Sequence, residues 1–211
     1  MIKIDKPKLP QTLPLGSFHA IFDDIDPYLE GIEIERADFD NESLSNVRLY
    51  QMIVKHATFR QTALPNIDIT DVQFENCDFS NADLSRASIH RVTFKNCKLL
   101  GVKLVEGRLG NVLFDNCLLS MSSFGDSKLD KVRFSSSTLE SADFFSCKLT
   151  KTVFNDCNLN GVNFDQTKLK GIDISRSRFE SLTVSPDELK GCIVSEEQAL
   201  AFAQMLGLVI K

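Results

Sequence analysis

The sequence predicts an all-β fold, a solenoid of square coils that stack on one another every twenty residues. Three observations lead to this prediction. Large apolar residues recur every five positions, nearly the same hexapeptide returns every twenty positions, and the regularity ends before a C-terminal segment with a helical pattern. Internal repeats are sought first because a missed repeat leads to the wrong fold.

The five-residue step begins at Ile34 and continues without interruption to Val184. Every residue on this step is Phe, Leu, Ile or Val, and the residue two positions earlier is usually small. A helix of about 3.6 residues per turn would wind such a stripe around its whole surface, and a strand alternates with a period of two. A short extended piece followed by a corner fits the pattern, because four such units close a square after twenty residues.

The hexapeptides FENCDF (74–79), FKNCKL (94–99) and FDNCLL (114–119) are therefore the same part of successive coils. Stacking places Phe over Phe, Cys over Cys and, at an outward corner, Asn over Asn, where amide groups can form a hydrogen-bonded ladder. With coils about 4.8 Å apart, residues 32–186 are expected to form nearly eight coils. Side chains should fill the interior and leave neither a pore nor a pocket of ligand size.

Residues 1–31 precede the repeat and are expected to cap the first coil, because an open solenoid end exposes apolar surface and unpaired backbone. They contain four of the six prolines together with the apolar residues Phe18 and Ile21. The alternative is that these residues form a flexible regulatory arm.

Residues 187–211 are expected to form a C-terminal helix that covers the last coil. Ser195 and Gln198 have the spacing of a capping box, and Gly207 is a natural stop. An apolar face at helical spacing comprises Ala199, Phe202, Ala203 and Leu206.

Apolar residues on the other faces of this helix either enlarge the cap or form a self-association surface, and we favour the second interpretation. The predicted dimer interface comprises Ala199, Leu200, Phe202, Ala203, Met205, Leu206, Leu208 and Ile210.

The composition favours a protein without catalytic, metal or cofactor sites. The three histidines are not spaced with Cys, Ser or Asp as a metal site or a catalytic triad requires, and the six cysteines include no CxxC pair. We expect no enzyme activity, no metal, no cofactor and reduced, buried thiols. Neither a signal peptide nor a membrane-spanning run is evident, so the expected location is cytoplasmic.

The charges divide the expected rod into an acidic side and a basic side. The face centred on Leu44, Leu64 and the positions in register with them sums to −4, whereas the face centred on Leu49 and Ile69 sums to +6. The candidate acidic face comprises Glu42, Asp83, Glu106, Asp126, Asp143 and Asp165, with Asp38 and Asp40 added from the first coil. Such charges either meet a basic partner or merely keep a solenoid soluble. We expect no direct contact with nucleic acid from the basic side, which lacks interleaved aromatic residues.

The repeat resembles that of the pentapeptide-repeat proteins over residues 32–186. The resemblance implies a right-handed quadrilateral β-helix.

The C-terminal spacing LxG…QA…LG is similar to that of the Qnr and MfpA quinolone-resistance proteins. It is carried by Leu189, Gly191, Gln198, Ala199, Leu206 and Gly207. This resemblance implies a homodimer joined through the C-terminus, which mimics DNA, binds bacterial DNA gyrase or topoisomerase IV, and protects these enzymes from quinolones or inhibits them. The unbroken repeat is of the loop-free, MfpA-like type, so protection that depends on loops does not carry over. The alternative is a scaffold or immunity protein with a different protein partner.

Overall fold

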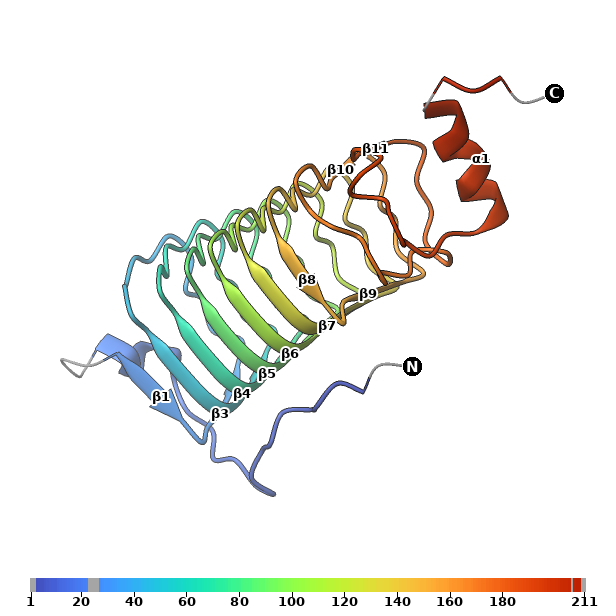
Figure 1. Cartoon of the computed structure of the whole chain (residues 1–211). Coiled ribbons are helices and arrows are strands. Elements are labelled where there is room, and N and C mark those ends of the chain that lie inside the picture. Colours follow the sequence, from blue (N-terminus) through green and yellow to red (C-terminus); the bar gives the residue numbers. More distant parts are fainter. Residues whose placement is uncertain (1–2, 23–26, 206, 210–211) are drawn as a thin grey trace.

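The protein forms an elongated β-solenoid, shown by a computed structural model that describes residues 3–22, 27–205 and 207–209 (Figure 1). About eight coils stack along the axis, and helix α1 (Glu196–Met205) lies at the C-terminal end. The predicted fold class is confirmed.

Five strands of eight residues form the longest continuous surface of the solenoid. They are β3 (Arg48–Lys55), β4 (Asp68–Glu75), β5 (Ser88–Lys95), β6 (Arg108–Asp115) and β7 (Lys128–Ser135). Shorter strands extend or accompany this sheet: β1 (Tyr28–Glu30), β2 (Glu33–Glu35), β8 (Lys148–Thr150) and β9 (Val153–Asn155). A separate parallel pair is formed by β10 (Val162–Asn163) and β11 (Leu182–Thr183).

Neighbouring strands are parallel and shifted by twenty residues, as the repeat predicts. Phe74 pairs with Phe94, and Phe94 pairs with Phe114. The two remaining faces are connected by isolated parallel bridges in the same register. Parallel pairing also extends beyond residues 32–186, since Tyr28 pairs with Arg48 and Asp173 forms a bridge with Ile193.

The corners of the coils are residues with a left-handed backbone conformation. A non-glycine residue with φ between 49° and 63° occurs at nearly every fifth position from Arg36 to Gln166. Asn tolerates this conformation better than most residues because its short amide can hydrogen-bond locally, which accounts for the recurrence of Asn at the corners. The predicted amide ladder is present between Asn116 and Asn96, where Nδ2 donates to Oδ1 at 2.9 Å.

Stacked phenylalanine rings fill the interior. Rings in the column through Phe94, Phe114 and Phe134 are stacked and nearly parallel, with successive centroids 5.0 and 4.9 Å apart. Rings from the opposite face, such as Phe124, meet this column edge-on, 6.3 Å from the centroid of Phe114. The stacked ring columns offer no hydrogen-bond partner for a tyrosine hydroxyl or an indole N–H, which is consistent with 16 Phe, 2 Tyr and no Trp.

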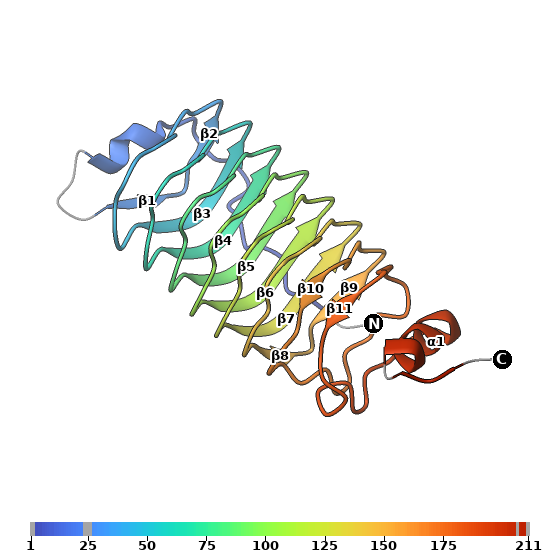
Figure 2. The ribbon, with the colours of Figure 1, turned by 90° about the horizontal axis from the view of Figure 1, so that it is seen from above.

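Residues before the repeat form both a cap and an arm. The 3-10 helix η1 (Phe18–Phe22) buries Phe18 and Ile21 over the first coil, with the Phe18 ring 4.5 Å from that of Phe39. Residues of η1 thus cover part of the apolar surface at this end. Residues 3–10, here named the N-terminal arm, instead run back along the outside of the coils (Figures 1 and 2).

Candidate binding surfaces

The structure brings five of the predicted acidic residues onto one side of the rod, here named the acidic side: Asp83, Glu106, Asp126, Asp143 and Asp165. Glu106 and Asp126 occupy the same corner of adjacent coils, and both side chains are exposed. Asp83 and Asp143 lie in one column, although Lys103 pairs directly with Asp83 and interrupts the negative charge. The negative charge of the acidic side is thus most concentrated at the Glu106–Asp126 corner.

Two carboxylates of the acidic side also accept hydrogen bonds from backbone N–H groups. Asp83 Oδ1 accepts the N–H of Ser85 at 2.9 Å, and Asp143 Oδ1 accepts the N–H of Phe145 at 3.0 Å. Such turns are a common use of Asp. Burial raises the pKa of Asp83, but hydrogen bonds from Ser85 outweigh burial and hold that pKa below its usual value. Asp83 therefore carries its charge at neutral pH.

The remaining predicted acidic residues lie elsewhere. Asp38 and Asp40 lie on the neighbouring face, where Arg60 Nε donates to Asp40 Oδ2 at 2.6 Å. Glu42 is half-buried at the head of the column of small inward residues that continues with Thr62. The structure therefore does not bring these three residues together with the Glu106–Asp126 corner.

The opposite charge gathers on the basic side, where like charges stack directly. Arg108 pairs in register with Lys128, and Lys128 pairs with Lys148. All three side chains are exposed to solvent, which moderates their repulsion.

Helix α1 begins and ends as the sequence predicts. Ser195 Oγ accepts the N–H of Gln198 at 3.2 Å, and Gln198 Oε1 accepts the N–H of Ser195 at 3.0 Å, which completes the capping box. At the other end Gly207 has φ +80°, and its N–H donates to Gln204 O, while Leu208 N–H donates to Ala203 O. This pair of bonds is a Schellman motif.

The face of α1 that covers the last coil differs from the predicted one. Phe202 is only 7% exposed and packs 5.2 Å from the Phe179 ring, as expected, but Ala199 is exposed. Gln198 is buried instead, because its Nε2 donates to the carbonyls of Ile174 and Ser177 at 2.9 and 2.7 Å. A polar side chain thus belongs to the face of α1 that covers the last coil, because it donates hydrogen bonds to carbonyl groups at the end of the solenoid. The spacing of apolar residues does not predict this contact.

Several apolar side chains are exposed at this end, beside the exposed Glu196, Glu197 and Gln204. Leu200, Leu208 and Val209 are exposed, and Ala203 is half-buried. Leu206, Ile210 and the side chain of Met205 lie outside the part of the chain that the structure describes. The predicted dimer interface stays a prediction, and its exposed members are Ala199, Leu200 and Leu208.

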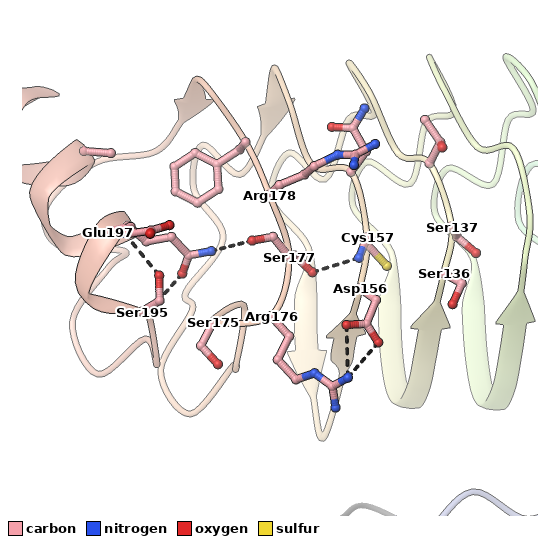
Figure 3. A pocket seen from close by; sticks show the side chains of 15 residues that line it. Ser136, Ser137, Asp156, Cys157, Ser175, Arg176, Ser177, Arg178, Ser195 and Glu197 are labelled. Carbon is pink, nitrogen blue, oxygen red and sulfur yellow. Dashed lines mark hydrogen bonds and ion pairs between the residues drawn. The ribbon is translucent and has the colours of Figure 1, made fainter.

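A pocket of about 480 Å³ lies between the last coils and α1 (Figure 3). Its lining is largely polar, and Arg176 Nη2 donates to both carboxylate oxygens of Asp156 at 3.1 and 2.9 Å. This pocket lies on the exterior, whereas the expectation of no pocket concerned the interior of the rod. The pocket depends on where α1 leaves the last coil, which no sequence pattern fixed.

The thiols of Cys97 and Cys147 are buried and weakly acidic. Hydrogen bonding to Cys117 is the main cause that raises the pKa of Cys97 to about 12, and burial raises the pKa of Cys147 to about 12. At pH 8 a thiol with a pKa near 12 is about one part in ten thousand thiolate, the form that reacts with disulfide reagents.

We expect Cys97 and Cys147 to resist labelling by a disulfide reagent at pH 8 in the native protein and to react at once in 6 M guanidinium. Mass spectrometry of the labelled peptides measures this difference. Rapid labelling of the native protein at either residue would contradict the packing described here.

Two family models match the chain. One, described as a pentapeptide repeat region, matches residues 67–144, and the other, described as pentapeptide repeats in 8 copies, matches residues 137–176. Together they cover more than half of the chain, so this protein belongs to the pentapeptide-repeat family. No curated protein matched the chain by sequence.

Solved structures to which this chain is similar include a trypsin-treated variant of QnrB1, a plasmid-mediated fluoroquinolone resistance protein. It is 16% identical, with 85% of this chain and 99% of that chain covered and a TM-score of 0.42. HetL from the cyanobacterium Nostoc sp. strain PCC 7120, a protein involved in heterocyst differentiation regulation, is 18% identical over 80% of this chain and 90% of that chain, with a TM-score of 0.31. At these identities the likeness concerns the fold alone. Among the described residues, no helix is long and apolar enough to cross a membrane.

Proposed function

We propose that this protein binds bacterial DNA gyrase or topoisomerase IV at the surface that receives DNA, and thereby protects these enzymes from quinolones or inhibits them. The observation that supports the proposal most is the acidic side of an uninterrupted rod, with Glu106 and Asp126 exposed on adjacent coils. Binding is reversible and needs no bond to form or break. The C-terminal resemblance to the Qnr and MfpA proteins supports the same partner.

The proposed interaction depends on the charge of one side of the rod and not on the total charge of the repeat region. Duplex DNA has about one negative charge per 1.7 Å, whereas residues 32–186 contain 20 acidic and 19 basic residues. Only one side of the rod can therefore present a negative surface to a basic groove. The attraction should weaken as salt rises, because the Debye length falls to about 8 Å at physiological ionic strength.

Fluorescence anisotropy of a labelled DNA duplex bound to gyrase tests the shared surface. We expect this protein to displace the duplex in a concentration-dependent way, and less effectively at higher salt. Binding of this protein to gyrase with the duplex still in place would contradict the proposed mimicry.

We also propose that two copies associate through the C-terminal segment. Leu200, Leu208 and Val209 are exposed apolar side chains of this segment that a second copy would cover. Phe202 is already buried against Phe179 of its own chain, so it contributes to the docking of α1 rather than to a free surface.

Light scattering on a Leu200→Asp/Leu208→Asp variant measures this association. We expect the molar mass to fall from that of a dimer to that of a monomer, because a dimer would bury two uncompensated charges from each chain. Leu118→Asp is the matched control, since Leu118 and Leu200 are both 51% exposed. A dimer that survives in the double variant would show that the interface lies elsewhere.

A second candidate function is a scaffold that binds another protein through an apolar patch. Leu118 and Met121 are both exposed on the middle of the rod, and Met121 occupies the corner before that of Asp126. Exposed apolar side chains that adjoin one another often mark a protein contact. If Leu118→Asp changed partner binding while charge reversal of the acidic side did not, this second function would be favoured.

A further inference from the structure

The N-terminal arm is held by side chains from one corner of the solenoid. This corner lies within the long strands β4, β5 and β6, at the residue where each strand turns from one face to the next. We name these side chains the corner column: Asp71, Arg91 and Asn111.

Two backbone hydrogen bonds attach the arm to the corner column. The N–H of Lys8 donates to Asp71 Oδ1 at 2.8 Å, and the N–H of Asp5 donates to Asn111 Oδ1 at 3.1 Å. The chain therefore runs antiparallel to the growth of the solenoid, past three successive coils.

The spacing of these bonds matches the spacing of the coils. A polyproline II segment has three residues per turn and advances about 3.1 Å per residue, so the N–H groups of Asp5 and Lys8 would face the same way, roughly 9.3 Å apart. Two coil steps of about 4.8 Å span a similar distance, roughly 9.6 Å. A segment of this kind can thus present one N–H to every second coil without strain.

Burial and residue type agree with a fitted contact. The two acceptors, Asp71 and Asn111, are only 5% and 7% exposed. Ile4, Pro7 and Leu9 of the arm are half-buried, so the arm contributes apolar contacts as well as hydrogen bonds.

The charges of the column and the arm are complementary. Arg91 Nε and Nη2 donate to the two carboxylate oxygens of Asp71, each at 2.6 Å. Asp5 attracts Arg91, and Lys8 attracts Asp71. Burial raises the pKa of Asp71, but the hydrogen bonds from Arg91 and Lys8 outweigh it and keep that pKa below its usual value.

We propose that the corner column is a recognition surface for an extended, proline-containing peptide that carries an acidic residue and a basic residue three positions apart, and that the N-terminal arm is its resident ligand. Pro7 and Pro10 favour an extended backbone before binding, which lowers the entropy lost on docking. Because the arm is tethered, its effective concentration is of millimolar order. The arm therefore occupies the corner column and prevents other extended segments from binding there until it is displaced. This inference does not depend on the proposed topoisomerase partner.

Amide hydrogen exchange followed by NMR tests the contact in the full chain. We expect the amides of Asp5 and Lys8 to be protected, and to exchange at least tenfold faster in an Asp71→Ala/Asn111→Ala variant. Asn116→Ala, which removes an amide from a different corner ladder, should leave both amides unchanged. Unprotected exchange of these amides in the wild-type protein, or no change in the double variant, would overturn the proposal.

A second experiment leaves the corner column intact, so that a folding defect in the alanine variant cannot obscure the result. The full chain carries Asp5→Pro and Lys8→Pro, which remove the two N–H donors, and a labelled peptide of residues 1–12 is added and followed by anisotropy. We expect the peptide to bind this variant at least tenfold more tightly than it binds the wild-type chain or a Lys6→Pro control. Equal binding to all three chains, or equal binding of a peptide that carries both prolines, would overturn the proposal.

Discussion

Replacement of Phe114 by Ala is expected to lower the free energy of unfolding by about 3–5 kcal/mol, the usual loss for Phe→Ala in a core. The Phe114 ring stacks between Phe94 and Phe134, with centroids 5.0 and 4.9 Å away, and is fully buried. The cavity forms in the middle of a quasi-one-dimensional stack, where each coil depends on its two neighbours. Urea denaturation followed by circular dichroism measures the change.

Phe145→Ala is the matched control for this prediction. Phe145 sits at an outward position and is half-buried, so the same chemical change should cost roughly 1 kcal/mol or less. Comparable losses for the two variants would mean that the stacked column does not dominate stability.

Reversal of Glu106, Asp126 and Asp165 to Lys is expected to weaken gyrase binding by roughly a hundredfold, because unfavourable charge pairs at an interface cost several kcal/mol in total. The fold should survive, since Lys131 and Lys151 already occupy left-handed corners with φ 55° and 49°. Asp143 is left in place because it holds the backbone N–H of Phe145. Surface plasmon resonance on immobilised gyrase measures the affinity.

A triple variant of the basic side, Arg108→Glu, Lys128→Glu and Lys148→Glu, reverses the same number of charges and serves as the control. We expect it to bind gyrase at least as tightly as the wild-type protein. Equal weakening in both triple variants would show that charge on the acidic side has no special role.

The repeat made most of the fold predictable from sequence. The apolar character of every fifth residue is enough to predict that its side chain points inward. Stacking in register follows because Phe94 must lie over Phe74 for both side chains to be buried. The capping box of Ser195 and Gln198 was equally readable, because it depends on contacts between residues three positions apart.

Features that depend on contacts between distant segments were not predictable. The path of the N-terminal arm is set by Asn111, more than a hundred residues away in sequence, and no periodicity links the two. Burial of Gln198 also depends on residues distant in sequence, because its side-chain amide donates hydrogen bonds to the carbonyls of Ile174 and Ser177. Among the acidic residues, Asp38 and Asp40 were assigned by charge rather than by face, and the structure places them on the neighbouring face.

Supercoiling of relaxed plasmid by purified bacterial gyrase, with and without ciprofloxacin, tests the proposed function most directly. Titration of this protein should restore supercoiling in the presence of the drug at low concentrations, or inhibit supercoiling in its absence at higher ones, and the Glu106/Asp126/Asp165 triple reversal should lose both effects. If neither reaction responds to the wild-type protein at any concentration, binding to the DNA surface of gyrase is contradicted.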